Sequence, residues 1–126
     1  MSAELYHACD FTNLLGIPHS KQNCVQLINN FYSNWSIPVA IDFYDNWFIH
    51  KQDIIKSILA KDFKKVTFIP EIGDLLVFSS RAFITHFAIY VGNNRMLHVL
   101  ENELSCIESM DKWKKQLYGI YRINRV

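Results

Sequence analysis

The sequence lacks the features of a secreted, a membrane-spanning or a nucleic-acid-binding protein. Its first ten residues contain no basic segment followed by an apolar one, so we expect no secretory signal and synthesis in a cytoplasm. No apolar run has the length of a transmembrane helix, which predicts no membrane span. An excess of one charge is also lacking, since 13 Lys+Arg stand against 12 Asp+Glu. This balance excludes the electrostatic footprint expected of a nucleic-acid-binding protein.

Cysteine is scarce, and its three positions are Cys9, Cys24 and Cys106. An odd number of cysteines without a signal peptide argues against a disulfide framework, so at least one thiol should be free. No Cys-x-x-Cys pair occurs, and the Cys and His residues do not have the spacing of a zinc site. We therefore expect no metal and no cofactor.

Internal repeats, low-complexity tracts and long Gly/Ser linkers are absent too. The 126 residues fit one domain of ordinary size, so we predict a single domain over residues 1–126. Half of the residues are apolar, including nine Phe, six Tyr and three Trp. A chain of this length and composition can bury a core without disulfide bonds.

Two segments have the periodicity of amphipathic helices. After the turn signal at residues 16–18, apolar residues recur at three- and four-residue spacing. These are Cys24, Leu27, Ile28, Phe31 and Tyr32. Ser20 or Asn23 could cap this helix, which places Cys24 in its first turn. A second helix is predicted over about residues 53–63, and the aromatic stretch 39–51 receives no assignment.

From residue 66 onward the pattern changes to short apolar strands. They are predicted at residues 66–69, 75–78, 85–91, 96–100, 104–107 and 117–123, with a helical turn at 111–116. Residues 92–95, Gly-Asn-Asn-Arg, read as a hairpin connection. Helices followed by an antiparallel sheet predict an α+β fold with the N-terminal helices packed on the sheet.

Cys24 is the first candidate for chemistry. A helix N-terminus lowers the pKa of a thiol through its free N–H groups and dipole, and the same groups can hold a forming oxyanion. We therefore expect a thiolate at neutral pH. Taken alone, Cys24 also fits a small buried residue on the apolar stripe of its helix.

Two histidines can support this thiol. His86 lies on one predicted strand of the hairpin and His98 on the other. If Gly92, Asn93 and Asn94 form a three-residue loop, the two histidines are diagonal neighbours on one face, roughly 7 Å apart at the backbone. A two-residue loop would put them on opposite faces, so the hypothesis requires the longer loop or a bulge. One imidazole could then accept the thiol proton while the other orients it.

Three segments with these residues resemble the NlpC-type cell-wall cysteine peptidases, which have a papain-like fold. They are N-C-V-Q-L-I-N-N-F-Y, P-E-I-G-D-L-L-V-F and T-H-F-A-I-Y-V-G-N-N-R-M-L-H-V. The resemblance covers about residues 16–122. It implies that Cys24 is the nucleophile, His86 the general base and His98 the orienting residue. The implied substrate is a peptidoglycan stem peptide, cleaved at the amide between the side-chain carboxyl of D-Glu and a diamino acid.

Near the nucleophile the sequence departs from the family pattern. His19 stands where members usually have Tyr after the Pro, and Asn23 replaces the usual Asp or Ser before the Cys. We place both residues in the substrate-binding wall. This altered approach keeps a second hypothesis open, an inactive structural or assembly protein, and a third, an acyltransferase on the same scaffold.

The segments F-Y-S-N-W-S-I-P and Y-G-I-Y-R look closest to the short family members found in phage tails. The resemblance implies a virion component that aids cell-wall penetration, with other phage tail proteins as partners. The favoured hypothesis is therefore a thiol hydrolase of a phage tail, made in the host cytoplasm.

Overall fold

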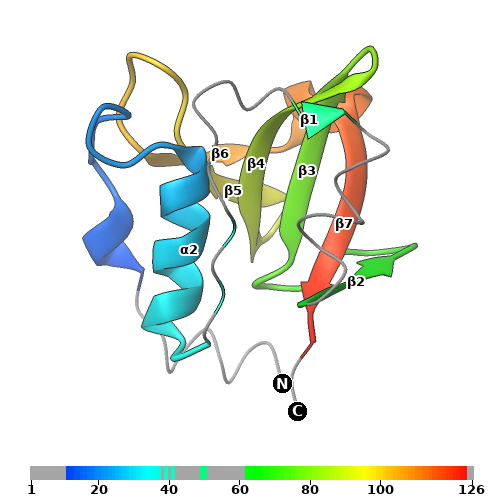
Figure 1. The fold of residues 1–126 in the computed structure, drawn as a ribbon, viewed down its shortest axis with the longest axis horizontal. Coiled ribbons are helices and arrows are strands. Elements are labelled where there is room, and N and C mark those ends of the chain that lie inside the picture. The colour runs from blue at the N-terminus through cyan, green and yellow to red at the C-terminus, as the bar shows by residue number, and fades with distance from the viewer. Residues whose placement is uncertain (1–10, 38, 40, 42–48, 51–61, 125–126) are drawn as a thin grey trace.

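The computed structural model describes residues 11–37, 39, 41, 49–50 and 62–124 (Figure 1). These form, in chain order, the 3-10 helix η1 (Thr12–Leu14), the helix α2 (Cys24–Asn34), the strands β1 (Ile49–His50), β2 (Phe63–Val66), β3 (Leu75–Ser80), β4 (Phe83–Gly92), β5 (Arg95–His98) and β6 (Cys106–Ser109), the 3-10 helix η3 (Asp111–Gln116) and the strand β7 (Leu117–Ile123).

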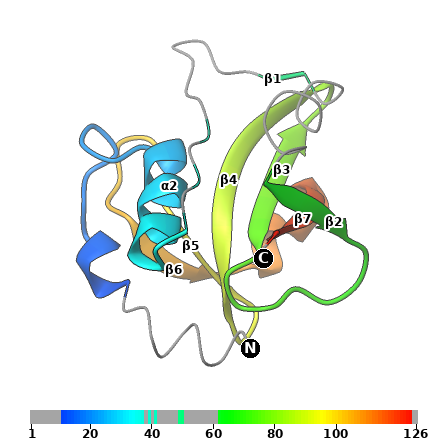
Figure 2. The same cartoon turned by 60° about the horizontal axis from the view of Figure 1, so that its bottom comes forward.

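The strands form one sheet in the order β2-β7-β3-β4-β5-β6, and the short β1 also pairs with β4. Every pairing in this sheet is antiparallel. Figures 1 and 2 show α2 standing beside β4, with the sheet curving away from the helix. The predicted α+β arrangement, with the Cys24 helix packed on an antiparallel sheet, is confirmed.

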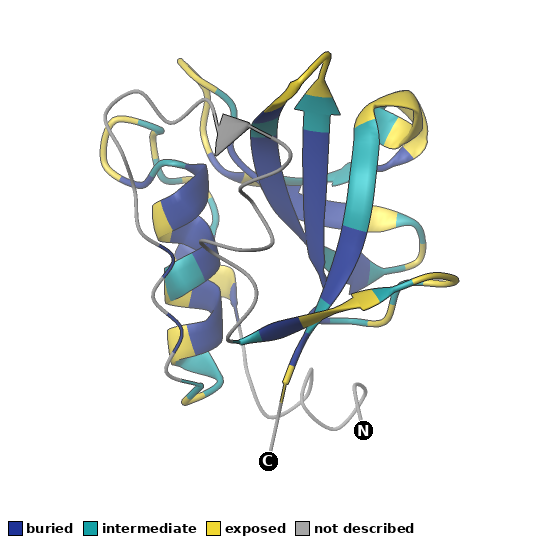
Figure 3. Ribbon diagram, turned by 45° about the vertical axis from the view of Figure 1, so that its right-hand side comes forward, coloured by how far each residue is buried: buried dark blue, intermediate teal, exposed yellow. Residues whose placement is uncertain are grey.

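Side chains of the central strands alternate between two buried faces, as the two-residue period of a strand requires. One face packs against the apolar stripe of α2; its sheet members include Leu75, Val77, Phe87 and Ile89. The other face carries Leu76, Phe78, Ala88, Met96, Met110 and Ile120, with Trp113 of η3 packed against it. The central strands are consequently buried along most of their length (Figure 3).

The start of α2 is fixed by a local hydrogen-bond motif. The Asn23 side chain accepts a hydrogen bond from the Gln26 backbone N–H, and the Gln26 side chain accepts one from the Asn23 backbone N–H. This capping box satisfies two N–H groups that the helix cannot pair internally. Of the two cap candidates, Asn23 is therefore the cap, and Cys24 is the first residue of the helix.

The β4–β5 hairpin has a two-residue turn, Asn93 and Asn94, both with positive φ (53° and 59°). Gly92 pairs with Arg95, but Tyr90 pairs with Met96, so Val91 is an extra residue on β4. Because of this bulge, the pairs from Tyr90 to the end of the hairpin away from the turn are shifted by one residue relative to the pair beside the turn. The register is thus the one that a three-residue loop would have given, and the sequence-based condition for the histidine pair is met.

Three predicted elements differ from the structure. Residues 53–61 of the predicted second helix lie outside the described residues, and Phe63 instead begins β2, where it packs on the ring of Tyr32. The strand predicted at 66–69 ends at Val66, since Phe68 and Ile69 point into solvent at 84% and 80% exposure. The strand predicted at 104–107 lies at residues 106–109. In the described part of the chain, no helix is long and apolar enough to cross a membrane.

Candidate active site

Cys24 lies at the N-terminus of α2, where the helix meets the sheet. The residue is 2% exposed and lines a cavity of about 380 Å³ together with His86, His19 and Trp113. Backbone N–H groups of Phe87, Val25 and Cys24 itself donate toward the sulfur. Because Phe87 follows His86 on β4, the thiol sits against the strand segment that carries the predicted base.

His86 and His98 form a hydrogen-bonded pair. The distance between His86 Nε2 and His98 Nδ1 is 3.0 Å, and the two rings meet at 73°. A second bulge precedes His86, because Phe78 pairs with His86 while Ser79 pairs with Ile84, which leaves Thr85 extra. Bulges turn side chains beside functional sites. The two bulges of β4 thus flank the segment that carries His86.

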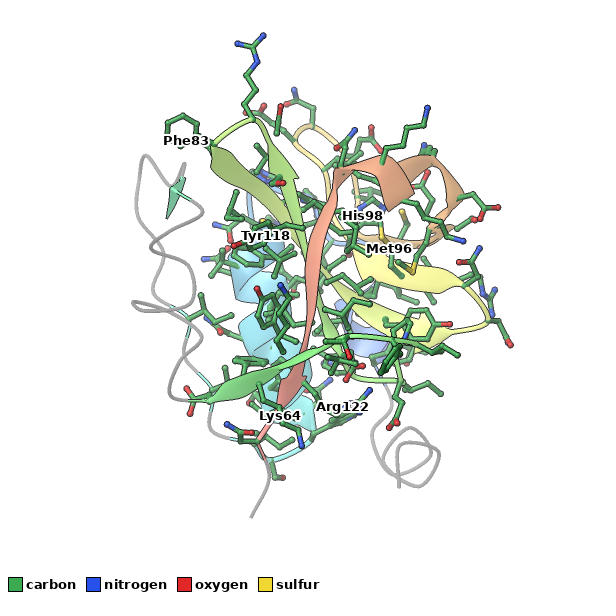
Figure 4. All side chains as sticks on the ribbon, turned by 90° about the vertical axis from the view of Figure 1, so that its right-hand side faces the viewer. Lys64, Phe83, Met96, His98, Tyr118 and Arg122 are labelled. Atoms are coloured by element: carbon green, nitrogen blue, oxygen red, sulfur yellow. The ribbon has the colours of Figure 1, made fainter. Side chains whose placement is uncertain are left out.

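Two aromatic rings, which also contact each other, pack against the His86 imidazole. The indole of Trp113 stacks on it with centroids 5.3 Å apart and an interplanar angle of 27°. The ring of Phe78 lies 5.8 Å away. His98 is 1% exposed and also touches Trp113, edge to face. Figure 4 shows His98 beside Met96, next to the segment that leads from β6 into η3. The pair is therefore rigidly packed.

Glu108 of β6 is a member of this site that the sequence reasoning missed. Its Oε1 lies 2.7 Å from His98 Nε2, and its Oε2 forms an ion pair with Lys112. His98 pairs with Cys106 and Met96 with Glu108, so Glu108 is the diagonal neighbour of His98 on the same face. The available signal was the alternation of residues 106–109, which the predicted strand at 104–107 cut short.

The electrostatics differ from the expected thiolate. Burial raises the pKa of Cys24 to about 12, and the backbone N–H groups that lower it are outweighed. Burial also lowers the pKa of His86 to about 3, with the neighbouring His98 acting in the same direction. In the free protein both groups are therefore neutral at pH 7, and the prediction of a resting thiolate is wrong. The thiolate prediction relied on the helix N-terminus, which acts locally, whereas desolvation of the thiol depends on the whole core packed around it.

The two residues predicted to bind substrate lie in different settings. His19 lines the cavity together with His86, and it lies on the loop that leads into α2. Asn23 is not among the residues that line the cavity, and its side chain is engaged in the helix cap. Contact with substrate stays a prediction for both. Among the described residues, no group of three or more His, Cys, Asp or Glu side chains could hold a metal ion.

Comparison with known proteins gives a family match and similar solved folds. The family model described as NlpC/P60 family matches residues 20–122. A structure from Staphylococcus aureus subsp. aureus Mu50, described as similar to a lipoprotein of the NLP/P60 family, is 20% identical with a TM-score of 0.60. An NlpC/P60 family protein from Bacillus cereus ATCC 10987 is 16% identical with a TM-score of 0.65.

The alignments cover 98% and 97% of this chain but 40% of each of those chains. The chain thus spans less than half the length of the two solved proteins, and at these identities the likeness shows the shared fold. No curated protein matches the chain. The family model covers most of the sequence, including Cys24, His86 and His98. The chain therefore belongs to the NlpC/P60 family.

Proposed function

We propose that this protein is a cysteine peptidase that cleaves amide bonds in peptidoglycan stem peptides. The observation that carries the proposal is the meeting of Cys24 and His86 in one cavity, with His98 hydrogen-bonded to His86 at 3.0 Å. Cell-wall peptidase activity is typical of the family. Cys24 is the nucleophile, His86 the general base, and His98 orients the His86 ring.

The proposed reaction begins from a neutral thiol and a neutral imidazole. His86 Nε2 faces His98, so Nδ1 is the nitrogen left to accept the proton of Cys24. As this proton moves, the sulfur attacks the amide carbonyl, while N–H groups at the start of α2 stabilise the oxyanion. His86 returns the proton to the departing amine, and water hydrolyses the acyl-enzyme.

Proton transfer and attack belong to one step in this scheme. Since burial disfavours both the thiolate and the imidazolium, the charged pair forms when substrate brings an electrophilic carbon to the sulfur. Acyltransfer requires the same acyl-enzyme with an amine in place of water. An added amine acceptor that diverts the product would favour that reaction.

For the substrate, we propose the amide between the side-chain carboxyl of D-Glu and a diamino acid, with His19 and Asn23 on the substrate side.

We also propose that the protein is a phage tail component that acts during cell-wall penetration beside other tail proteins. The segments 31–38 and 118–122, which resemble short tail members, support this location. Detection in purified virions is the expected result; a protein found free and absent from virions would contradict it.

Digestion of purified muropeptides tests the activity. The wild-type protein should release fragments cut at the D-Glu amide, identified by mass spectrometry. Cys24→Ala should abolish cleavage with an unchanged circular dichroism spectrum, and His86→Ala should come close to that. Cys106→Ala, a matched removal of an exposed free thiol, should cleave as well as the wild type. Equal cleavage by Cys24→Ala would place the activity elsewhere.

A second candidate is a structural part of a tail tip without turnover. The near-complete burial of Cys24 and its raised pKa favour this alternative. A peptide electrophile built on D-Glu, such as a vinyl sulfone, separates the two. An enzyme should be labelled at Cys24 faster than by iodoacetamide at the same pH, because the peptide aligns the electrophile with the sulfur. Equal labelling rates and no muropeptide cleavage would establish the structural role.

A further inference from the structure

Glu108 contacts His98 at Nε2, the ring nitrogen that does not face His86. Its carboxylate has three donors: His98 Nε2 at 2.7 Å, Trp113 Nε1 at 3.4 Å, and Lys112 Nζ in an ion pair. We propose that Glu108 is a positioning residue of the reaction, because its carboxylate fixes which ring nitrogens of His98 and His86 carry protons. The inference rests on the proposed function, but it also has a test that needs no substrate.

Hydrogen-bond rules assign the protons. An ionised carboxylate only accepts hydrogen bonds, so His98 Nε2 carries the proton shared with Glu108. A neutral imidazole has one N–H group, which leaves His98 Nδ1 as an acceptor. The hydrogen of the 3.0 Å bond therefore belongs to His86 Nε2. His86 Nδ1 keeps its lone pair and can act as the base for Cys24.

The charge states agree with this assignment. Burial alone would raise the pKa of Glu108, but hydrogen bonds from Lys112 and His98 outweigh it and hold the pKa below its usual value. Burial lowers the pKa of His98 more than Glu108 raises it. An ionised carboxylate thus faces two neutral rings at pH 7. The titratable groups acting on these rings are His19, His86, His98, Glu103, Glu108 and Lys112.

Glu108 also bears on the charge that develops during the reaction. When the S–H bond of Cys24 breaks and His86 Nδ1 gains the proton, Cys24 becomes a thiolate and His86 an imidazolium. The net charge of these two residues together is unchanged. The Nε2–H of His86 then points along the hydrogen bonds that lead through His98 to the Glu108 carboxylate. The neutral His98 cannot stabilise this charge as a carboxylate does. Glu108 supplies the negative charge, as the next residue after His98 in the chain of hydrogen bonds.

Trp113 couples the two ends of this chain of hydrogen bonds. Its indole stacks on His86, and its N–H points at Glu108. Both Trp113 and Lys112 belong to η3, and Glu108 belongs to β6, so the support comes from the segment after the histidine strands. The β6–η3 segment therefore sets the orientation of the base through its contacts with both histidines.

The test compares Glu108→Gln with a matched control, Asp111→Asn. Gln has the shape of Glu, but its amide can donate to His98 Nε2, which permits the reversed proton arrangement in both rings. Asp111 lies on the neighbouring η3 and contacts Asn94 rather than a histidine. Long-range proton–nitrogen NMR of the histidine rings reads the tautomers, and muropeptide cleavage gives kcat and KM.

Wild type and Asp111→Asn should show His98 and His86 with the proton on Nε2. Glu108→Gln should show mixed tautomers. Its kcat should fall about 10- to 100-fold, the range for outer hydrogen-bond partners of metal-bound histidines. KM should change little, since Glu108 is not among the residues that line the cavity.

Two outcomes would overturn the proposal. One is a wild-type protein in which His98 is protonated on Nδ1. This measurement uses the wild type alone, so it does not depend on whether Glu108→Gln folds. The other is a Glu108→Gln protein whose tautomers and kcat equal those of Asp111→Asn. If the tautomers shift as expected but the wild type cleaves no muropeptide, the proton arrangement stands and the proposed peptidase function fails.

Discussion

The buried neutral His86 makes the stability of this protein depend on pH in a defined direction. Burial lowers the pKa of His86 from 6.5 to about 3. Below pH 6.5 the unfolded chain therefore binds a proton that the folded protein rejects. Protonation then favours the unfolded state, so stability is fully present above pH 6.5 and falls as the pH falls toward 3.

The expected magnitude follows from this shift. Each pH unit between the two pKa values costs about 1.4 kcal/mol, so acidification from neutral to about pH 4 should remove roughly 3 kcal/mol. The side chain is 6% exposed, which leaves little solvent to relax the penalty. A loss of that size is a large fraction of a typical stability of about 5–15 kcal/mol.

Urea denaturation of wild type and His86→Gln, at neutral pH and at about pH 4, measures this contribution. The wild type should lose roughly 3 kcal/mol more than the variant over that interval, with the denaturant slope of both proteins unchanged. His98 and Glu108 remain in the variant, so their titration contributes to the loss in both proteins. Equal losses in the two proteins would refute the claim that His86 is buried in its neutral form.

Three further predictions concern other parts of the chain. Because burial raises the pKa of Cys24 from 9.0 to about 12, stability should fall above pH 9, by roughly 3 kcal/mol at about pH 11, and Cys24→Ser should lack this loss. Gly73→Ala should lower the melting temperature, at a cost of roughly 1–3 kcal/mol, since φ is +97° and a Cβ would overlap the Trp35 indole; an unchanged melting temperature would contradict this. Arg122→Met should cost roughly 3–5 kcal/mol in denaturant titration, because it strips buried Asp74 of two hydrogen bonds of 2.8–2.9 Å; a loss near zero would contradict this.

Local pattern was enough to predict that Cys24 lies in the first turn of α2, with Ser20 or Asn23 as the cap, and which face of the helix is buried. The stripe from Cys24 to Tyr32 and the cap at Asn23 lie within a few residues of one another, and helices form from such short-range interactions. Alternation likewise put His86 and His98 on definite faces of their strands. The sequence itself therefore determined the α+β order and the residue types of the site.

Long-range pairing decided the rest. The extra residue Val91 on β4 sets the histidine register; Gly92 beside it, with φ +95°, is compatible with a bulge, but only the pairing of β4 with β5 shows that the bulge forms. Glu108 reaches His98 only because β6 pairs with β5 in one register, and Phe63 joins a strand because β7 offers it a partner. The neutral state of Cys24 also comes from tertiary structure, since desolvation sums over every element packed around the thiol, while a helix terminus acts locally.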